Sequence, residues 1–410
     1  MGVPKLRFKA DDGSDFPDWE EMTLGDVGSV AMCKRVFKEQ TREVGDVPFF
    51  KIGTFGGVPD AYISKSLFDE LKSKYAYPEV GTILLSASGT IGRQVEYQGE
   101  DAYYQDSNIV WLEHDDTVLD SYLKQFYSVV KWQGLEGSTI KRLYNKTILD
   151  TPFYRPSLPE QRKIAGLLSA VDDVISAQEA EVAAWEKRKK GVMQKLFSQE
   201  VRFKADDGSD FPDWEEKTLG DLGYFIRGLS YNKTQVLDDG SDASGTAVLR
   251  SNNINSDGTL DYRDDVQLVS KEPSSEQQLC ENDVVICMAN GSNRLVGKAA
   301  RYDGGYDARR ITVGAFCGIF RTDSPLVPWW FQSDDYKSFL HLSKQGGDGA
   351  LANLKGKDIE AISLLFPSSS TEQREIADCL ASLDDVIAKA KDELDAWREL
   401  KKGLLQQMFV

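Results

Sequence analysis

A chain of 410 residues has room for two or three globular domains. Its composition, 41% hydrophobic and 10% aromatic, excludes a largely disordered protein. No apolar run approaches the roughly 20 residues that span a bilayer. Five cysteines without a CxxC pair predict reduced thiols in a cytoplasmic protein, and only two histidines occur, so neither a disulfide framework, a zinc site nor a histidine triad is expected. The net charge of −17 opposes nucleic-acid binding unless the acidity is unevenly distributed.

In chain order, the first feature is an acidic segment, residues 7–28, which returns as residues 202–223 with 20 of 22 positions identical. Each copy holds seven acidic side chains, so much of the negative charge lies in the repeats. The blocks between them, residues 29–155 and 224–366, are therefore free to present a basic face. A duplicated chain predicts a pseudo-two-fold protein, which can hold two copies of one partner symmetrically.

The block 29–155 contains a strand, a glycine-rich loop and a second strand in GTILLSASGTIGRQVEY, from Gly81. The second block repeats this plan in NDVVICMANGSNRLVGKAARY, from Asn282, so that Gly92-Arg93 matches Gly297-Lys298. Gln133-Gly134 with Leu143-x-x-Lys146 likewise resembles Gln345-Gly346 with Leu354-x-x-Lys357. The blocks are thus predicted to be divergent copies of one α+β domain whose loops differ.

Each block is followed by a long helical segment, residues 156–201 and 367–410. A 4-3 spacing of seam positions runs through both segments at an offset of 212. The seam residues are Ile164, Leu168, Val171, Ile175, Val182 and Trp185, and Ile376, Leu380, Leu383, Ile387, Leu394 and Trp397. We expect the two helices to form an intramolecular coiled coil. The alternative is that each helix recruits a foreign partner.

Two details of these helices carry further expectations. Ser157-x-x-Glu160 and Ser369-x-x-Glu372 predict a capping box at each helix start. Lys189 and Lys401 interrupt both seams at the same place. They are interpreted either as lysines that snorkel to solvent at a helix end or as residues that set the register.

The loops of both blocks hold residue types that suit DNA, because Arg pairs with guanine, Asn and Gln with adenine, and Lys with phosphate. Solvated polar loops remain the alternative for each residue taken alone. The candidates in the first block are Ser86, Ser88, Thr90, Arg93, Gln105, Asn108, Ser138, Thr139, Lys141 and Arg142. Those in the second are Arg250, Asn252, Asn253, Asn290, Ser292, Asn293, Arg294, Lys298, Arg309, Arg310, Lys344, Asn353 and Lys355.

Signatures of catalysis are not found. The glycine-rich loops lack the G-x-x-x-x-G-K-[ST] ending of a P-loop, and no dinucleotide fingerprint or methyltransferase tetrapeptide occurs. No spacing of Asp, Glu and Lys singles out a nuclease site. We therefore predict no catalytic residues, no metal and no cofactor.

Taken together, VPKLRF with DFPDWEEMTLGDVG, PEQRKIAGLLSAVDDVI and KKGVMQKLFSQEVRF resemble the specificity subunit of type I restriction–modification systems over essentially the whole chain. The resemblance implies a first target-recognition domain (1–155), a spacer helix (156–201), a second target-recognition domain (202–366) and a second spacer helix (367–410). The expected fold is α+β, with two similar α/β domains separated by two long antiparallel helices in a pseudo-two-fold arrangement. One ending differs, because the second helix stops at Phe409-Val410, and we expect the N-terminus to close the ring there.

The resemblance also implies a function. Each target-recognition domain would read one half of a bipartite double-stranded DNA site, and the coiled coil would set the spacing. Two modification subunits, which use S-adenosylmethionine, and restriction subunits, which use ATP and magnesium, would join this non-catalytic chain away from any membrane. A coiled-coil scaffold for two proteins is the main alternative; an independent repressor and an enzyme are the others.

Overall fold

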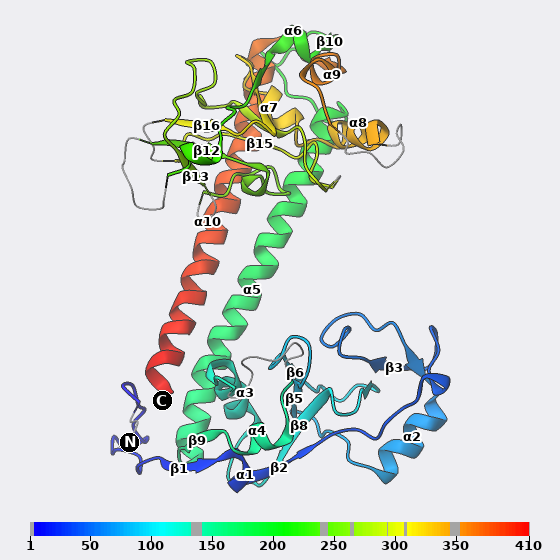
Figure 1. Ribbon diagram of the computed structural model, residues 1–410, viewed down its shortest axis with the longest axis vertical. Helices are drawn as coiled ribbons and strands as arrows, with labels where there is room; N and C mark the ends of the chain where they lie inside the picture. The colour runs from blue at the N-terminus through cyan, green and yellow to red at the C-terminus, as the bar shows by residue number, and fades with distance from the viewer. Residues whose placement is uncertain are drawn as a thin grey trace. The chain divides into compact units, whose positions relative to one another are not determined.

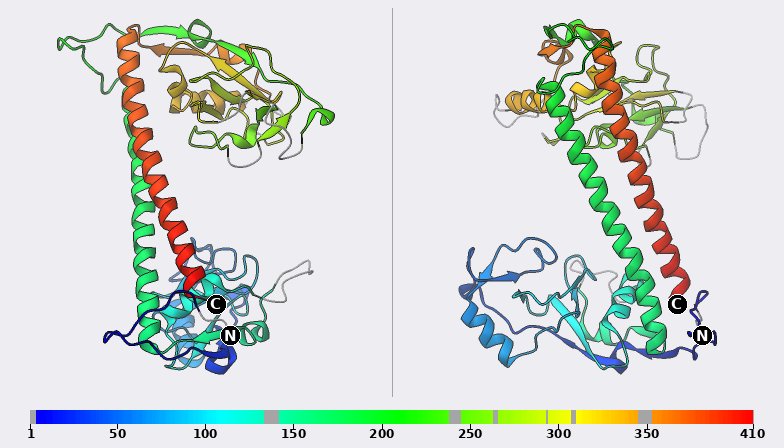
Figure 2. Two further views of the ribbon diagram at one scale, coloured as in Figure 1. Left: turned by 90° about the vertical axis from the view of Figure 1, so that its left-hand side faces the viewer. Right: turned by 180° about the vertical axis from the view of Figure 1, so that it is seen from behind.

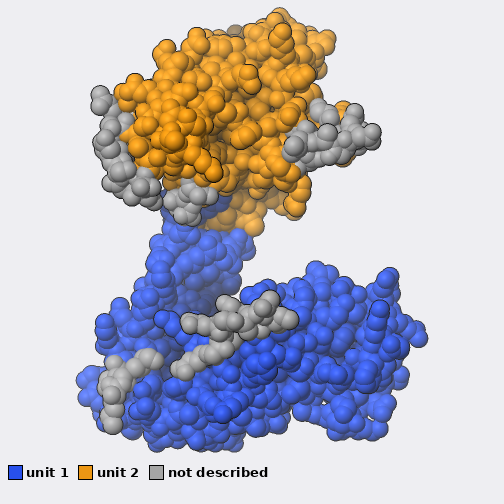
Figure 3. Space-filling view, in the orientation of Figure 1, with its two compact units in different colours: residues 1–180, 391–410 blue, residues 181–390 orange. Residues whose placement is uncertain are grey.

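The chain forms two compact units, residues 1–180 with 391–410 and residues 181–390, which are described separately (Figure 3). The computed structural model describes residues 4–132, 142–237, 245–262, 266–292, 294–306, 310–344 and 353–409, without the side chains of residues 343 and 344. No helix in these ranges is long and apolar enough to cross a membrane.

The described residues of the first unit form three small sheets (Figure 1). A two-stranded sheet pairs β1 with β9, a four-stranded sheet has the order β2-β8-β5-β6, and a three-stranded sheet has the order β4-β3-β7. Only the pair β3 and β7 is parallel among these strands. The strands are β1 Glu20–Thr23, β2 Gly28–Ala31, β3 Val47–Phe50, β4 Tyr62–Ile63, β5 Ile83–Ser86, β6 Gln94–Glu96, β7 Tyr103–Tyr104, β8 Ile109–His114 and β9 Pro152–Arg155.

The second unit repeats this topology strand for strand. Its sheets have the orders β10-β18, β11-β17-β14-β15 and β13-β12-β16, and again one pair, β12 with β16, is parallel among the described strands. The strands are β10 Glu215–Thr218, β11 Tyr224–Arg227, β12 Thr246–Leu249, β13 Gln267–Val269, β14 Val284–Cys287, β15 Ala299–Arg301, β16 Ile311–Val313, β17 Cys317–Arg321 and β18 Ser363–Phe366. The prediction that the blocks are divergent copies of one domain is confirmed.

Short helices connect the strands of both units. In the first unit they are α1 Leu24–Val27, α2 Lys65–Lys74, α3 Asp120–Val129 and α4 Asn145–Leu149, with a 3₁₀ turn at Lys38–Gln40. In the second they are α6 Leu219–Leu222, α7 Val327–Trp330, α8 Asp334–Lys344 and α9 Gly356–Glu360, with 3₁₀ turns at Lys233–Gln235 and Ser251–Asn253.

Strands β5 and β14 are equivalent interior strands of the two four-stranded sheets. Each is buried on both faces, which explains its continuous apolar sequence. In β5, Ile83 and Leu85 pack toward the long helices, whereas Leu84 packs toward the three-stranded sheet. The same alternation places Val284 of β14 on the helix side and Val285 on the other. Each unit is therefore layered, with the four-stranded sheet between the helices and the smaller sheet.

Two helices, α5 at Leu158–Phe197 and α10 at Ser370–Met408, contribute to both units and lie side by side (Figures 1 and 2). In the first unit, Ile164 and Leu168 share a core with Leu405 and Met408, so the helices run antiparallel. In the second unit, Leu196 shares a core with Ile376 and Leu380. Every predicted seam residue is buried or half-buried. The predicted antiparallel helix pair is confirmed.

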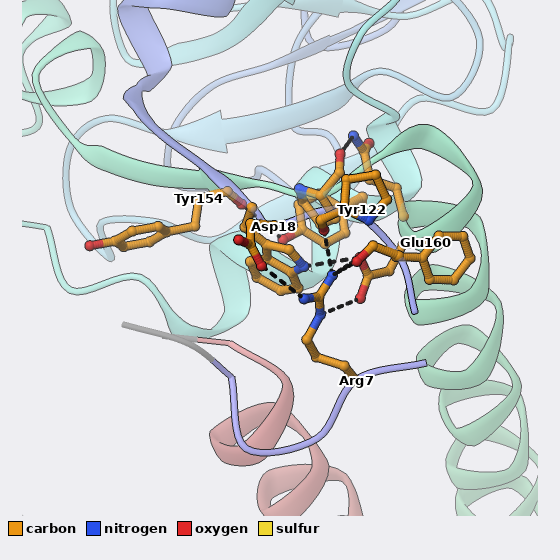
Figure 4. Close-up of polar contacts among 10 residues, drawn as sticks. Arg7, Asp18, Tyr122, Tyr154 and Glu160 are labelled. Carbon is orange, nitrogen blue, oxygen red and sulfur yellow. Dashed lines mark hydrogen bonds and ion pairs between the residues drawn. The ribbon is translucent and has the colours of Figure 1, made fainter. Parts of the chain in front are cut away.

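The acidic repeat binds the first turn of each long helix, and Figure 4 shows this contact at α5. Arg7 donates from Nε to Glu160 Oε1 at 3.0 Å and from Nη2 to Oε2 at 2.9 Å, and Trp19 Nε1 donates to Oε2 at 3.0 Å. Arg7 Nη2 also donates to the Pro17 carbonyl at 2.6 Å. The hydrogen bond to the Glu160 carboxylate raises the pKa of Arg7. We call this arrangement the clasp.

The second unit contains the same clasp. Arg202 donates to both carboxylate oxygens of Glu372 at 2.9 and 3.0 Å, and Trp214 Nε1 donates to Oε1 at 3.2 Å. Glu160 and Glu372 are both completely buried, so each carboxylate depends on these donors for compensation of its charge. This requirement is one physical reason why the repeat is so nearly identical in its two copies.

A close backbone contact gives a second reason. The repeats end at Gly28 and Gly223, where a Cβ atom would lie 2.4 Å from the Glu113 carbonyl oxygen and 2.3 Å from that of Arg321. Both glycines begin or precede the first strand of the four-stranded sheet, and any larger residue would push that strand away from its neighbour.

The predicted capping box is partly present at the start of α10, whereas at α5 Ser157 Oγ makes no hydrogen bond to the described residues, so the predicted cap there is wrong. The Glu372 amide donates to Ser369 Oγ at 3.4 Å, as a cap requires. However, the carboxylates of Glu160 and Glu372 bind Arg and Trp of the acidic repeat instead of turning back to the helix start. The reciprocal half of the box was therefore a wrong prediction, because a charged bidentate partner binds a carboxylate more strongly than a backbone amide does.

The expected closure at the end of α10 is present within the first unit. The Leu6 amide donates to the Gln407 carbonyl at 3.0 Å, and Phe409 stacks on Tyr122 with ring centroids 5.4 Å apart. In the second unit the Val201 amide donates to the Lys195 carbonyl at 3.2 Å. Because Leu6 and Val201 precede the two clasp arginines, the junction between separate segments copies the junction within the continuous chain.

Candidate nucleic-acid interface

Three segments distant in sequence meet beside β5 in the first unit. The Ala87 amide donates to the Asn108 carbonyl at 2.7 Å, and the Leu143 amide donates to the Ala87 carbonyl at 2.8 Å. These bonds join residues 86–93, 105–108 and 142–144 into one loop cluster, which we call the first node. The cluster gathers candidate residues that lie more than 50 positions apart in the sequence.

Polar side chains interlock within the first node. Ser88 Oγ donates to Asn108 Oδ1 at 2.8 Å, and Arg142 Nη2 donates to the Ser107 carbonyl at 2.9 Å. The Ser107 backbone has a φ of 54°, a left-handed conformation that the surrounding bonds must hold. Ser88, Asn108 and Arg142 are half-buried, so their polar groups are fixed in position while part of each remains accessible.

The second unit builds an equivalent cluster from residues 287–292, 294–298, 314–316 and 353–355, the second node. The Met288 amide donates to the Phe316 carbonyl at 2.9 Å, and the Leu354 amide donates to the Met288 carbonyl at 2.9 Å. Asn290 Nδ2 donates to Ser251 Oγ at 2.8 Å. Asn353 and Lys355 are exposed beside it. The two nodes share a backbone framework but differ in their side chains.

The remaining candidates lie within the nodes or near them, and several of them bind the backbone. Arg93 Nη1 donates to the Phe55 carbonyl at 2.8 Å, and Gln105 Oε1 accepts from the Ile52 amide at 3.0 Å. In the second unit, Lys298 Nζ donates to the Ile254 carbonyl at 3.4 Å, and Arg310 pairs with Glu272 at 2.8 Å. The exposed candidates are Thr90, Arg93, Asn252, Ser292 and Arg294, and Arg250 is half-buried.

Two candidates are corrected by their burial. Ser86 is 1% exposed, accepts a hydrogen bond from the Arg93 amide and donates to the Thr90 carbonyl. Asn253 is 1% exposed and bridges the Arg250 amide to the Asp261 carbonyl. Both side chains hold loops together, which takes them out of the set that we propose to contact DNA. Ser138, Thr139, Lys141, Asn293 and Arg309 lie outside the described residues, and only the backbone of Lys344 is described.

Features near the nodes that the sequence did not single out are a cavity and two exposed aromatic residues. The cavity, about 400 Å³, is lined by Lys34, Arg35, Tyr75 and Asp106, among others, next to the first node. Tyr144 and Phe316 are exposed at the first and second node, respectively. Neither aromatic residue belongs to the polar residue types from which the candidates were predicted, although Phe316 precedes β17 as the candidate Asn108 precedes β8.

The described residues contain no group of three or more His, Cys, Asp or Glu side chains arranged to hold a metal ion. The candidate interface is built from amides, hydroxyls, guanidinium groups and aromatic rings. These are the groups that contact base edges and phosphates in protein–DNA complexes.

A family model described as the type I restriction modification DNA specificity domain matches residues 17–184, which include the first node and much of α5. The chain is similar to specificity subunits of type I restriction–modification systems. The specificity subunit of EcoKI from Escherichia coli is 30% identical over 199 residues, which is 48% of this chain and 41% of that protein.

Two further specificity subunits extend the similarity. A Haemophilus influenzae protein, named provisionally as specificity subunit S.HindORF215P, is 54% identical over 155 residues, 38% of this chain and 40% of that protein. The alignment with the Methanocaldococcus jannaschii MjaX specificity subunit, also a provisional name, is 23% identical and covers 98% of this chain and 95% of that protein. The chain thus matches about two fifths of some relatives and nearly all of another.

A solved structure supports the fold of the specificity family for the whole chain. The type I restriction–modification S subunit from M. genitalium aligns with a TM-score of 0.60 and 18% identity, and the alignment covers 100% of this chain and 99% of that one. The predicted fold class, two α/β domains with long paired helices, is confirmed by this likeness and by the strand orders above.

Proposed function

We propose that the chain recognises a bipartite site in double-stranded DNA, with one node for each half-site. The observation that carries this proposal is the duplicated node: the same three segments, joined by equivalent backbone hydrogen bonds, present different side chains. Conserved scaffolding with altered contact residues suits two domains that perform one task on two sequences. The match of residues 17–184 to a DNA specificity domain supports the same role.

The partners follow from the duplication and the family. Two modification subunits, which would carry S-adenosylmethionine, bind the repeated surfaces, and restriction subunits join the assembly on cytoplasmic DNA. The chain itself binds no cofactor and catalyses no reaction in this proposal. Cationic partner surfaces would offset its net charge of −17 and strengthen DNA binding.

The long helices supply the spacing between the half-sites. Helix α5 contains 40 residues, which corresponds to about 60 Å of continuous helix at about 1.5 Å per residue. Its seam packs against α10 in both units. A stiff paired helix can fix a half-site separation, as dimer geometry does in other DNA-binding proteins.

Footprinting tests the proposal. The chain is assembled with its modification subunits, and we expect protection of two short DNA segments separated by an unprotected spacer. Replacement of residues 29–155 by the equivalent block of a relative should change one segment and leave the other intact. If both segments change, the assignment of one half-site to each domain is wrong.

The same experiment distinguishes the alternatives. A scaffold for two proteins would assemble with the partners but protect no specific DNA, whereas an independent repressor would give the full footprint without modification subunits. Incubation of the isolated chain with labelled S-adenosylmethionine and DNA tests for an enzyme. Transfer of label by the chain alone would contradict a non-catalytic role.

A further inference from the structure

Phe316 is an exposed aromatic residue at the centre of the second node. Its side chain is 72% exposed, although the turn that carries it, between β16 and β17, is held firmly. The Phe316 carbonyl accepts hydrogen bonds from the amides of Met288 at 2.9 Å and Ala289 at 3.1 Å. The ring is therefore presented to solvent by a bonded turn rather than by a frayed chain end.

The first unit places Asn108 at the position of Phe316. Asn108 immediately precedes β8 as Phe316 precedes β17, and its carbonyl accepts from Ala87, the counterpart of Met288. The following strands pair equivalently, β8 with β5 and β17 with β14. The same corner of the framework thus carries an amide in one domain and a phenyl ring in the other.

The residue next to this corner also changes from polar in the first node to apolar in the second. In the first node Ser88 donates to Asn108, so the two residues form a polar pair. The position after Met288 is Ala289, so the corresponding pair in the second node is alanine and phenylalanine. An apolar spot therefore replaces a hydrogen-bonding spot at the same place. Asn290 follows Ala289 in the chain, and Asn353 and Lys355 flank Leu354, whose amide bonds to Met288. Their side chains are of types suited to base edges and phosphates.

Apolar side chains among such polar groups have a specific use on DNA. The C5-methyl group of thymine is the apolar feature of the major groove, and residues such as Phe and Ala contact it. We propose that Phe316 contacts a thymine methyl group in the half-site bound by the second domain and thereby specifies thymine at that position. This inference rests on the proposed function. The first domain, with Asn108 at the equivalent corner, uses a polar base edge there.

The experiment uses the chain assembled with its modification subunits and duplexes that carry its footprinted site. Each thymine of the second half-site is replaced singly by deoxyuridine, which removes only the methyl group. One replacement should weaken binding by about fourfold, the value of one buried methyl-sized group. With Phe316→Ala, thymine and deoxyuridine duplexes should bind equally at that position.

Leu365→Ala is the matched control. Leu365 is 56% exposed in β18 of the same unit, outside the second node, so this variant should keep the thymine preference of the native chain. Thermal unfolding of both variants should resemble that of the native chain, because both side chains are largely exposed.

The outcomes separate the two proposals. If the native complex gives no footprint on the second half-site, the proposed function is overturned. An intact footprint with no thymine in that half-site, or with no deoxyuridine effect, would overturn the assignment of Phe316 alone. The assignment is also overturned if Phe316→Ala keeps the preference for thymine over deoxyuridine. If the variant keeps this preference but binds both duplexes more weakly, the result would indicate a ring that wedges between base pairs.

Discussion

Lys189 of α5 forms an ion pair with Asp384 of α10, with Nζ and Oδ1 2.6 Å apart. In the first unit Lys401 and Asp172 form the equivalent pair at 2.5 Å, with the roles of the helices exchanged. The two lysines are 212 positions apart in the sequence, and so are the two aspartates, which is the repeat offset. The lysines that interrupt the seams therefore pair across the helix interface. For Lys189, which is buried, the interpretation as a lysine that snorkels to solvent is wrong.

Each pair also contacts the globular part of its unit through a glutamine. Lys189 Nζ donates to Gln332 Oε1 at 3.0 Å, and Gln125 Nε2 donates to Asp172 Oδ2 at 3.1 Å. A polar group in an otherwise apolar seam can fix the register of two helices. Here it also links each node-bearing domain to the helix pair that packs against it.

Lys189→Ala should destabilise the chain by about 1–2 kcal/mol, because it leaves Asp384 partly buried without its partner. The value is lower than for a fully buried pair because solvent reaches Asp384. Urea unfolding measures the change, and Lys187→Ala, at an exposed position of the same helix, is the control. The double variant Lys189→Asp with Asp384→Lys should regain part of the loss. Equal stability of Lys189→Ala and the native chain would reject a role in register.

Arg202→Ala should cost more, about 3–4 kcal/mol, since Glu372 would remain completely buried with its charge largely uncompensated. Hydrogen exchange should detect the opening at the start of α10. Arg202→Lys should recover only part of the stability, because an ammonium group cannot make the two-pronged contact. Lys204→Ala, in the exposed part of the same repeat, is the control. Unchanged exchange in Arg202→Ala would contradict the clasp.

The sequence predicted those features that depend on local periodicity. The 4-3 spacing identified α5 and α10, and the shared loop landmarks Gly92 and Gly297 identified the duplicated domain. It could not identify the partner of Glu160, because Arg7 lies 153 residues away and the Ser157-x-x-Glu160 pattern favours a local cap. Nor could it separate Ser86, which is buried, from Ser88, which is accessible, since both are polar residues of one loop.

His114 should make stability depend on pH near neutrality. A hydrogen bond to Asp120 and one to the Asp115 carbonyl raise its pKa above the ordinary value of 6.5, against the opposing effect of burial. A raised pKa means that the folded state favours the proton, so this stabilisation is complete below 6.5 and is lost as pH rises through the higher folded-state pKa. In urea unfolding, the free energy of unfolding of the native chain should exceed that of His114→Gln by up to about 1 kcal/mol at pH 6 and by less at pH 8. A constant difference would contradict this linkage.

Arg93→Ala should weaken DNA binding by the assembled complex about tenfold and lower the dependence of log Kd on log salt concentration by about 1, as expected for one phosphate contact. Arg93 is an exposed residue of the first node. Lys298→Ala, at the equivalent position of the second unit, should have a similar effect on the other half-site. Titration at several salt concentrations measures both slopes. If Arg93→Ala leaves affinity unchanged, the loop supports the fold and does not contact DNA.

Insertion of one heptad in each long helix, after Ala180 in α5 and after Asp392 in α10, should lengthen the recognised spacer. These positions are equivalent under the repeat offset, and seven residues preserve the seam while they add about 10 Å of helix, or about three base pairs. Mapping of methylated adenines in DNA made with the complex measures the spacer. An insertion in α5 alone misaligns the seam and should abolish methylation, because Lys189 can no longer meet Asp384 while Lys401 meets Asp172. Methylation at the original spacing by the doubly extended chain would refute the role of the helices as a ruler.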